Sequence, residues 1–123
     1  MGNPHAITIV NNVEKINIKK YGPLLEQDFH FPNKANIEFA QIIDKNHIKM
    51  RVWERGAGET YACGTGACAT CVACYIDGLT ERSVEIQLLG GNLQIDWNQE
   101  NNHIYMTGPA KTICEGEFEY DNN

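Results

Sequence analysis

Long hydrophobic runs are missing from this chain of 123 residues. The apolar stretch around Ala67 to Ile76 is far too short to span a bilayer. Met1–His5 lacks the charged and apolar regions of a signal peptide. We therefore expect a cytoplasmic protein that has no membrane partner.

An excess of basic charge is also missing. The formal net charge is −6 and the pI is about 5.1, and the acidic residues are scattered rather than clustered. This balance argues against nucleic acid and anionic membrane surfaces as partners. Internal repeats and low-complexity tracts are absent as well. The length suits one domain with a hydrophobic core and leaves little room for a second.

Cysteine occurs five times, an odd number. Four of the five lie in one segment, at Cys63, Cys68, Cys71 and Cys74. Spacings this short suit neither a disulfide framework nor a secreted scaffold. The sequence therefore predicts reduced thiols.

Two helices are predicted, near Asn17–Gln27 and Thr65–Ile76. The first is typical of a surface helix, with an apolar face made of Ile18, Tyr21, Leu24 and Leu25. The second carries small or apolar residues around its whole circumference, so it must be buried on all sides.

The remaining segments read as short, closely spaced strands, a pattern that favours an antiparallel sheet or barrel over βαβ units. The expected strands are Ala6–Val10, Asn36–Ile43, His47–Trp53, Ser83–Leu89, Leu93–Trp97, His103–Thr107 and Lys111–Tyr120. We expect an α+β domain in which an antiparallel, barrel-like sheet surrounds the central helix Thr65–Ile76.

Cys63 stands where an extended segment turns, through Gly64 and Gly66, into the central helix. The first N–H groups of a helix have no internal partner, so they attract a carboxylate or phosphate. The same field stabilises a thiolate. The ordinary fate of a free cysteine is a buried structural thiol, but this position favours a reactive sulfur beside a carboxylate-binding turn.

An iron–sulfur electron carrier is an alternative, because Cys63, Cys68 and Cys71 with a distant Cys114 match the spacing of plant-type clusters. Such a cluster needs its cysteines on an irregular loop, whereas the intervening residues here look helical. Cys68, Cys71 and Cys74 are better interpreted as small hydrophobic residues of a buried helix.

Other polar residues have ordinary interpretations on composition alone. His5 follows a turn-forming run, which places it on a loop or at the mouth of a strand. Glu54 and Arg55 could be a solvated charge pair, and Asn3 and Asn36 could be turn or cap residues. The residues themselves leave these positions open.

Taken together, the motifs closely resemble the C-terminal half of the diaminopimelate epimerase family. The matching stretches follow the family's order through nearly the whole chain and are Met1–His5, Gly22–Glu26, Asn36–Phe39, Arg51–Thr60, Ala62–Ala69 and Tyr105–Ala110. The resemblance implies an isomerase of lysine and peptidoglycan-precursor synthesis that interconverts L,L- and meso-diaminopimelate with no metal, pyridoxal phosphate or flavin cofactor.

The resemblance also implies a missing half. Family members have two similar domains with the active site between them, and residues 1–123 would be the C-terminal domain, with the N-terminal domain absent. By itself the chain would then have no epimerase activity. Full-length members often pair as homodimers.

Catalytic roles follow from the same resemblance. Cys63 would be one of two cysteines that remove and return the α-proton on opposite faces of the substrate. Glu54 would contact the reacting ammonium and handle protons beside Cys63. His5 would face across the cleft and support the other domain's cysteine.

Substrate-binding roles carry over by motif position as well. Arg55 would grip the distal carboxylate of a small diamino dicarboxylate, and Asn3 and Asn36 would bond its distal end. The amides of Gly64 and Thr65 would hold the reacting carboxylate. Two alternatives from this comparison are a cysteine-dependent proline or hydroxyproline racemase and a non-catalytic ligand-binding domain.

Overall fold

The structure is a computed structural model that describes residues 5–28, 36–54, 58–60, 64–108 and 112–117. Within these residues the helices are η1 (Val13–Lys15, a 3-10 turn), α1 (Ile18–Asp28) and α2 (Gly64–Ile76). The strands are β1 (His5–Ile9), β2 (Asn36–Asp44), β3 (His47–Glu54), β4 (Gly58–Thr60), β5 (Ser83–Leu88), β6 (Gly91–Trp97), β7 (His103–Thr107) and β8 (Thr112–Glu117). Both predicted helices are confirmed, and none of the described helices is long and apolar enough to cross a membrane.

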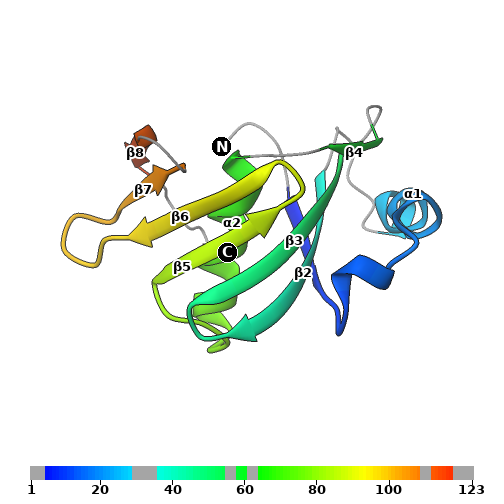
Figure 1. Cartoon of the computed structure of the whole chain (residues 1–123), viewed down its shortest axis with the longest axis horizontal. Helices are drawn as coiled ribbons and strands as arrows, with labels where there is room; N and C mark the ends of the chain where they lie inside the picture. The colour runs from blue at the N-terminus through cyan, green and yellow to red at the C-terminus, as the bar shows by residue number, and fades with distance from the viewer. Residues whose placement is uncertain (1–4, 29–35, 55–57, 61–63, 109–111, 118–123) are drawn as a thin grey trace.

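All the strands join one mixed sheet in the order β1-β2-β3-β5-β6-β7-β8, and the short β4 pairs with the end of β3 (Figure 1). The α+β class is correct, but the purely antiparallel sheet is wrong, because β1 pairs with β2 and β3 with β5 in parallel. Each parallel pair is joined by a connection that contains a helix, α1 or α2. A helical crossover carries the chain back to the end of the sheet at which the first strand began. The next strand therefore runs in the same direction.

The prediction of a barrel-like sheet is not confirmed. Among the described strands the ladder runs from β1 to β8, and these two end strands do not pair with each other. The sheet is therefore open over this part of the chain. Helix α2 packs against β1, β2, β5, β6 and β7, so it lies on one face of the sheet and spans most of its width.

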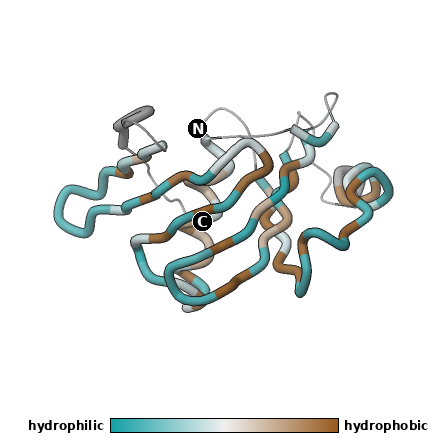
Figure 2. The backbone as a smooth tube through the Cα atoms, in the orientation of Figure 1, coloured by the Kyte–Doolittle hydropathy of each residue, from teal (hydrophilic) through white to brown (hydrophobic). Residues whose placement is uncertain are grey.

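Apolar side chains form two cores, one on each face of the sheet. The larger core joins α2 to residues of β2, β3, β5, β6 and β7, including Ala40, Met50 and Ile86. The smaller core joins α1 and η1 to the other face, through Ile37 and Phe39. Consecutive residues of a strand point to opposite faces, which explains why Asn36 to Ala40 are all buried. Figure 2 shows hydrophobic residues recurring along these strands.

Helix α2 is buried around most of its circumference, as its composition predicts. Seven of its residues are buried: Gly66, Ala67, Ala69, Thr70, Cys71, Val72 and Cys74. The hydroxyl of Thr70 donates to the carbonyl of Gly66, 2.8 Å away, and so is satisfied inside the helix. Small side chains let the sheet approach this helix closely.

Helix α1 buries only part of the predicted apolar face. Ile18 is buried and Leu25 packs against the smaller core, whereas Tyr21 and Leu24 are exposed. Gly22 lies on the same side of the helix, and the indole of Trp53 covers it so closely that a Cβ there would overlap the ring. The absence of a side chain at Gly22 thus lets α1 pack directly on Trp53.

Candidate functional site

Three of the predicted site residues lie in one row across three adjacent strands. His5 of β1 pairs with Asn36 of β2, and Asn36 pairs with Glu54 of β3. Side chains of directly paired residues lie next to each other on one face of a sheet. The fold therefore brings together His5, Asn36 and Glu54, which are separated by up to 49 positions in the sequence.

This row lies on the face of the sheet that α2 covers. On β2, Ala40 packs in the α2 core while Ile37 and Phe39 pack on the opposite face. The alternation of side chains along a strand then puts Asn36 on the α2 side. Glu54 takes the same side, because Val52, two residues earlier on β3, belongs to the α2 core.

Helix α2 begins at Gly64, at the edge of the molecule where β1 and β2 begin and β3 ends (Figure 1). Helix α2 packs against β1 and β2, two of the three strands that carry the polar row. Gly64 has little room for a side chain, since a Cβ there would lie 2.9 Å from the Met106 methyl group. Thr65 is exposed. The predicted start of the helix is confirmed, and its dipole favours a negatively charged group at this edge.

Glu38 belongs to this face as well, although the sequence motifs did not single it out. Its side chain is fully buried, and Oε1 lies 2.6 Å from Nδ1 of His5. The His5 side chain is only 4% exposed, so it is buried and not merely at the mouth of a strand. The sequence contains a signal for this residue. Glu38 is a charged residue between the apolar Ile37 and Phe39, and it lies two positions after Asn36, so both side chains point to the same face of the strand.

Burial is the main influence on the Glu38 carboxyl and raises its pKa above the ordinary value. The hydrogen bond and charge of His5 oppose this rise, while the negative charge of Glu54 adds to it. Among the described residues, neither Oε2 of Glu38 nor Nε2 of His5 has a hydrogen-bond partner. Over the described part of the chain, the pair is therefore a buried acid–base unit in which one polar atom of each member has no hydrogen-bond partner.

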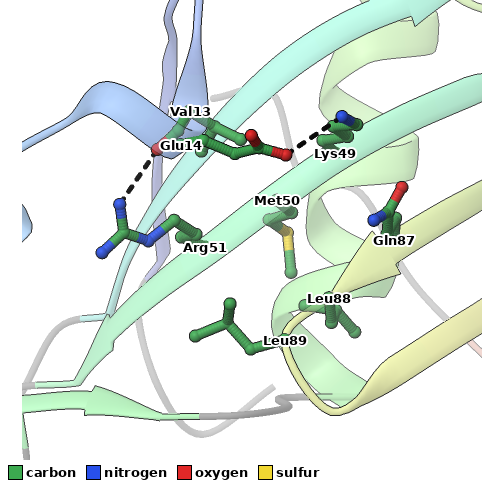
Figure 3. Close-up of a pocket in the computed structure, with 8 residues that line it drawn as sticks. All are labelled: Val13, Glu14, Lys49, Met50, Arg51, Gln87, Leu88 and Leu89. Carbon is green, nitrogen blue, oxygen red and sulfur yellow. Dashed lines mark hydrogen bonds and ion pairs between the residues drawn. The ribbon is translucent and has the colours of Figure 1, made fainter.

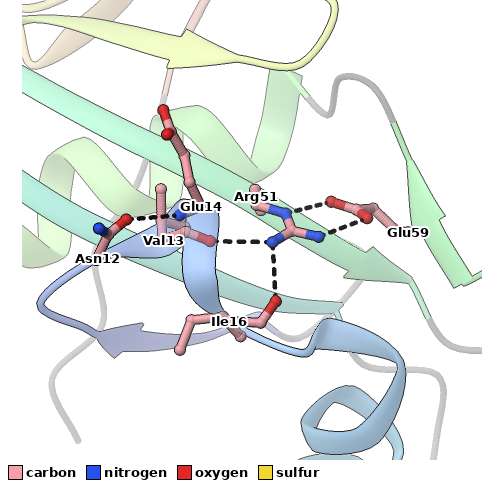
Figure 4. Close-up of polar contacts among 6 residues, drawn as sticks. All are labelled: Asn12, Val13, Glu14, Ile16, Arg51 and Glu59. Carbon is pink, nitrogen blue, oxygen red and sulfur yellow. Dashed lines mark hydrogen bonds and ion pairs between the residues drawn. The ribbon is translucent and has the colours of Figure 1, made fainter.

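Arg51 anchors the strand that precedes Cys63 in the sequence. Its guanidinium donates to both carboxylate oxygens of Glu59 on β4, at 2.6 and 2.8 Å. A third nitrogen, Nη1, donates to the carbonyls of Val13 and Ile16, each 3.0 Å away (Figure 4). The bond to Glu59 raises the pKa of Arg51. One side chain thus ties β4 to the turn around η1.

A small surface pocket of about 50 Å³ lies between η1, β3 and β5 (Figure 3). It is lined by Val13, Glu14, Lys49, Met50, Arg51, Gln87, Leu88 and Leu89. None of the predicted site residues lines it, and Glu14 and Lys49 are joined there by a 3.1 Å ion pair. The candidate site is therefore the polar row and not this pocket.

Three predicted site residues, Cys63, Arg55 and Asn3, lie outside the described residues. The other thiols of the cysteine-rich segment lie on α2, where burial raises the pKa of Cys71 to about 12 and that of Cys74 to about 11. Cys68 and Cys71 are separated by one turn of a regular helix rather than by a loop. This geometry favours the structural interpretation over an iron–sulfur cluster. The described residues contain no group of three or more histidine, cysteine, aspartate or glutamate side chains that could hold a metal ion.

The fold and the row define an α+β domain that presents acid–base side chains next to a helix N-terminus. Comparison with known proteins gives the family. The family model described as diaminopimelate epimerase matches residues 1–113, and the chain belongs to the diaminopimelate epimerase family.

Curated relatives agree with this assignment. A protein of Methanococcus maripaludis (strain C5) named diaminopimelate epimerase is 57% identical over 119 residues, which are 97% of this chain and 43% of that protein. One of Acetivibrio thermocellus with the same name is 55% identical over 97% of this chain and 42% of its own length. The chain therefore spans about two fifths of the length of the curated relatives that it matches.

A solved structure has a similar fold. The crystal structure of a Bacillus anthracis phenazine biosynthesis protein of the PhzF family matches with a TM-score of 0.57 and 27% sequence identity. The match covers 86% of this chain and 34% of that one. Two kinds of comparison thus relate this chain to part of a longer protein.

Proposed function

We propose that this chain supplies one half of the active site of a diaminopimelate epimerase that interconverts the L,L and meso isomers. The other half would come from a second, similar domain, so that residues 1–123 form the C-terminal domain of a pseudo-symmetric pair. In that arrangement the sheet curls around α2 and the helix N-terminus opens toward the other domain. The curated relatives named for this activity support the proposal.

The reaction requires proton transfer on both faces of one carbon. Cys63 acts on one face, as base when ionised and as acid when protonated, and a cysteine of the other domain acts on the opposite face. A thiol suits this exchange because its pKa is close enough to neutral for both forms to occur. Glu54 lies at the end of β3 and handles protons next to Cys63, while His5 supports the thiol of the other domain.

Groups on this chain bind the charged groups of the substrate. The first amides of α2, at Gly64 and Thr65, bind the reacting carboxylate and stabilise the charge that builds as the α-proton leaves. Arg55 holds the distal carboxylate through a planar fork of donors. Asn3 and Asn36 bond the polar groups at the distal end.

The observation that carries this proposal is the row of His5, Asn36 and Glu54 on the face covered by α2. The epimerase motif supplies these residues from three separate segments. A mere structural role would not require all three on one face, at the edge where α2 begins. A histidine, an amide and a carboxylate in one row provide both proton transfer and hydrogen bonding.

Cys63→Ser in the intact protein that contains this chain tests the proposal. Serine is a far weaker acid, so we expect epimerisation to stop and deuterium from heavy water to enter from only one face. Cys71→Ala is the matched control, because Cys71 is buried in α2 and its loss should affect packing rather than turnover.

Two results would contradict the proposal. One is an unchanged rate of isotope exchange in Cys63→Ser. The other is a wild-type protein that isomerises proline or hydroxyproline while leaving diaminopimelate unchanged, which would favour the related racemases.

A further inference from the structure

Glu38 is the only charged side chain among the fully buried residues that the structure describes. It lies on β2, the second strand of the sheet, and its paired neighbour on β3 is the buried Val52. On β1 the paired residue is Ile7, whose side chain packs against the α2 core. Glu38 therefore stands in an apolar environment that would suit a methionine or leucine of similar size.

A carboxylate in such a place needs a specific reason, because burying it is costly unless it is paired and hydrogen-bonded. The described residues give it one side-chain partner, Nδ1 of His5, at 2.6 Å. Its second oxygen has no partner among them. The bonding of Glu38 is thus directed almost entirely at one ring nitrogen.

The consequence for His5 lies at its other nitrogen. Imidazole has two ring nitrogens, and the hydrogen bond made by one determines the proton state of the other. An ionised carboxylate can only accept, so it holds the proton on Nδ1 and leaves a lone pair on Nε2. Nε2 is buried and has no hydrogen-bond partner in the described part of the chain. In this form the side chain therefore carries a proton acceptor at Nε2 that no described residue occupies.

We propose that Glu38 is a positioning residue that holds His5 in the Nδ1–H form, so that Nε2 accepts the proton of the thiol supplied by the other half of the active site. This role rests on the proposed epimerase function. The thiol S–H bond breaks and an Nε2–H bond forms, which gives a thiolate and an imidazolium. Glu38 then stabilises the imidazolium by its negative charge, and no electron transfer is involved.

Charged groups near the pair are compatible with this role. Glu54 lies in the neighbouring row of the same face, and its negative charge contributes to raising the pKa of Glu38. Arg51, on the same strand as Glu54, is engaged by Glu59 on the opposite face and does not compete for Glu38. Glu38 thus acts through His5 and is not itself placed against the substrate.

Two substitutions of Glu38 separate geometry from charge. Glu38→Met removes the acceptor, and we expect long-range ¹H–¹⁵N spectra of the intact protein to show His5 as a mixture of both neutral forms. Glu38→Gln keeps an acceptor oxygen of the same shape and removes the charge. It should keep the Nδ1–H form yet lower kcat for epimerisation about tenfold or more, with KM nearly unchanged.

The chain offers a matched control in Asp44 and His47. Their Oδ1 and Nδ1 atoms lie 2.8 Å apart, so the pair has the same chemistry, but both side chains are exposed at the β2–β3 turn. Asp44→Asn removes this carboxylate at the opposite end of the strands. We expect it to change neither the spectrum of His5 nor kcat.

Different failures point to different errors. A folded Glu38→Met protein in which His5 stays purely Nδ1–H overturns the positioning role, and so does Glu38→Gln with wild-type kcat and an unchanged pH profile. If Glu38→Met fails to fold, Glu38→Gln alone decides. A wild-type protein without epimerase activity refutes the proposed function, while the His5 spectra still test whether Glu38 holds the tautomer.

Discussion

Arg51 and Glu59 form a two-point ion pair that joins β3 to β4, the strand immediately before residues 61–63. Both side chains are mostly buried, at 16% and 21% exposure. Two further N–H groups of Arg51 donate to the carbonyl oxygens of Val13 and Ile16. This single guanidinium therefore fixes three segments relative to one another.

Arg51→Lys should destabilise the protein, because an ammonium cannot reproduce the planar fork that bonds Glu59 and two carbonyls. We expect the free energy of unfolding in urea to fall by about 2 kcal/mol. The control is Lys49→Met, which removes the more exposed pair with Glu14 and should cost less than about 1 kcal/mol. Equal losses in the two variants would contradict the special role of Arg51.

Gly22→Ala should also destabilise the protein, although alanine is the better helix former by about 1 kcal/mol. The new Cβ would overlap the Trp53 ring, so the ring or α1 must move. We expect a net loss of roughly 1–3 kcal/mol in unfolding free energy. Lys19→Ala, on an exposed position of the same helix, is the control. A Gly22→Ala protein as stable as wild type would show that the contact relaxes without cost.

Cys71 and Cys74 should resist alkylation in the folded protein. With pKa values of about 12 and about 11, they carry very little thiolate at neutral pH, and the thiolate is the reactive form. Iodoacetamide labelling with peptide mass spectrometry should find both unmodified under native conditions and modified in urea. Rapid native labelling of either thiol would mean that α2 opens readily.

The Glu38 carboxyl should make the free energy of unfolding depend on pH. Its pKa is raised in the folded state, mainly by burial, so above its unfolded pKa the folded protein binds more protons at this group than the unfolded chain does. The contribution of Glu38 to stability therefore falls as pH rises from the ordinary glutamate pKa through the raised one. Glu38→Gln should lose this component, and urea unfolding across that pH range measures the difference between the two proteins.

Asp44→Asn provides a control of opposite sign. The pKa of Asp44 is lowered, first by the backbone N–H of Asn46 and then by His47, so its contribution is present above the ordinary aspartate pKa and is lost as pH falls. The two difference curves should slope in opposite directions. A Glu38 difference that grows more favourable with pH would contradict the burial argument.

The purified chain alone should show no epimerase activity. Inverting a carbon centre requires proton transfer on both faces, and in the proposed mechanism Cys63 serves only one. Without the other domain the substrate groups would also stay open to water, where charge-assisted contacts are weaker. Calorimetry with diaminopimelate and a coupled isomer assay test this, with the protein containing both halves as positive control. Turnover by the chain alone would refute the two-domain mechanism.

Secondary structure could be predicted largely from local pattern. The strand His103–Thr107 is found as predicted, and the turn between Ile43 and His47 does join an antiparallel pair. Alternation and turn residues carry this information locally. Strand direction is not local, however. The crossovers through α1 and α2 make two pairs parallel, and short closely spaced strands gave no sign of it.

The candidate site divides in the same way. Motif positions indicated His5, Asn36 and Glu54 in advance, but their alignment depends on the register of three strands. The sequence did not indicate a role for Glu38, because its side chain contacts His5 only when β1 and β2 pair. On α1, the pattern indicated Ile18 and Leu25 on the buried side, but the close packing of the Trp53 ring on Gly22 appears only in the folded structure.

The sequence by itself determined the class of the protein, the two helices and most of the strands, because spacing, side-chain size and turn chemistry act between near neighbours. Tertiary structure alone decided the mixed sheet, the buried Glu38–His5 pair and the Arg51–Glu59 connection. Each of these joins residues from different elements, and its energy depends on burial and distance, which exist only once the chain has folded.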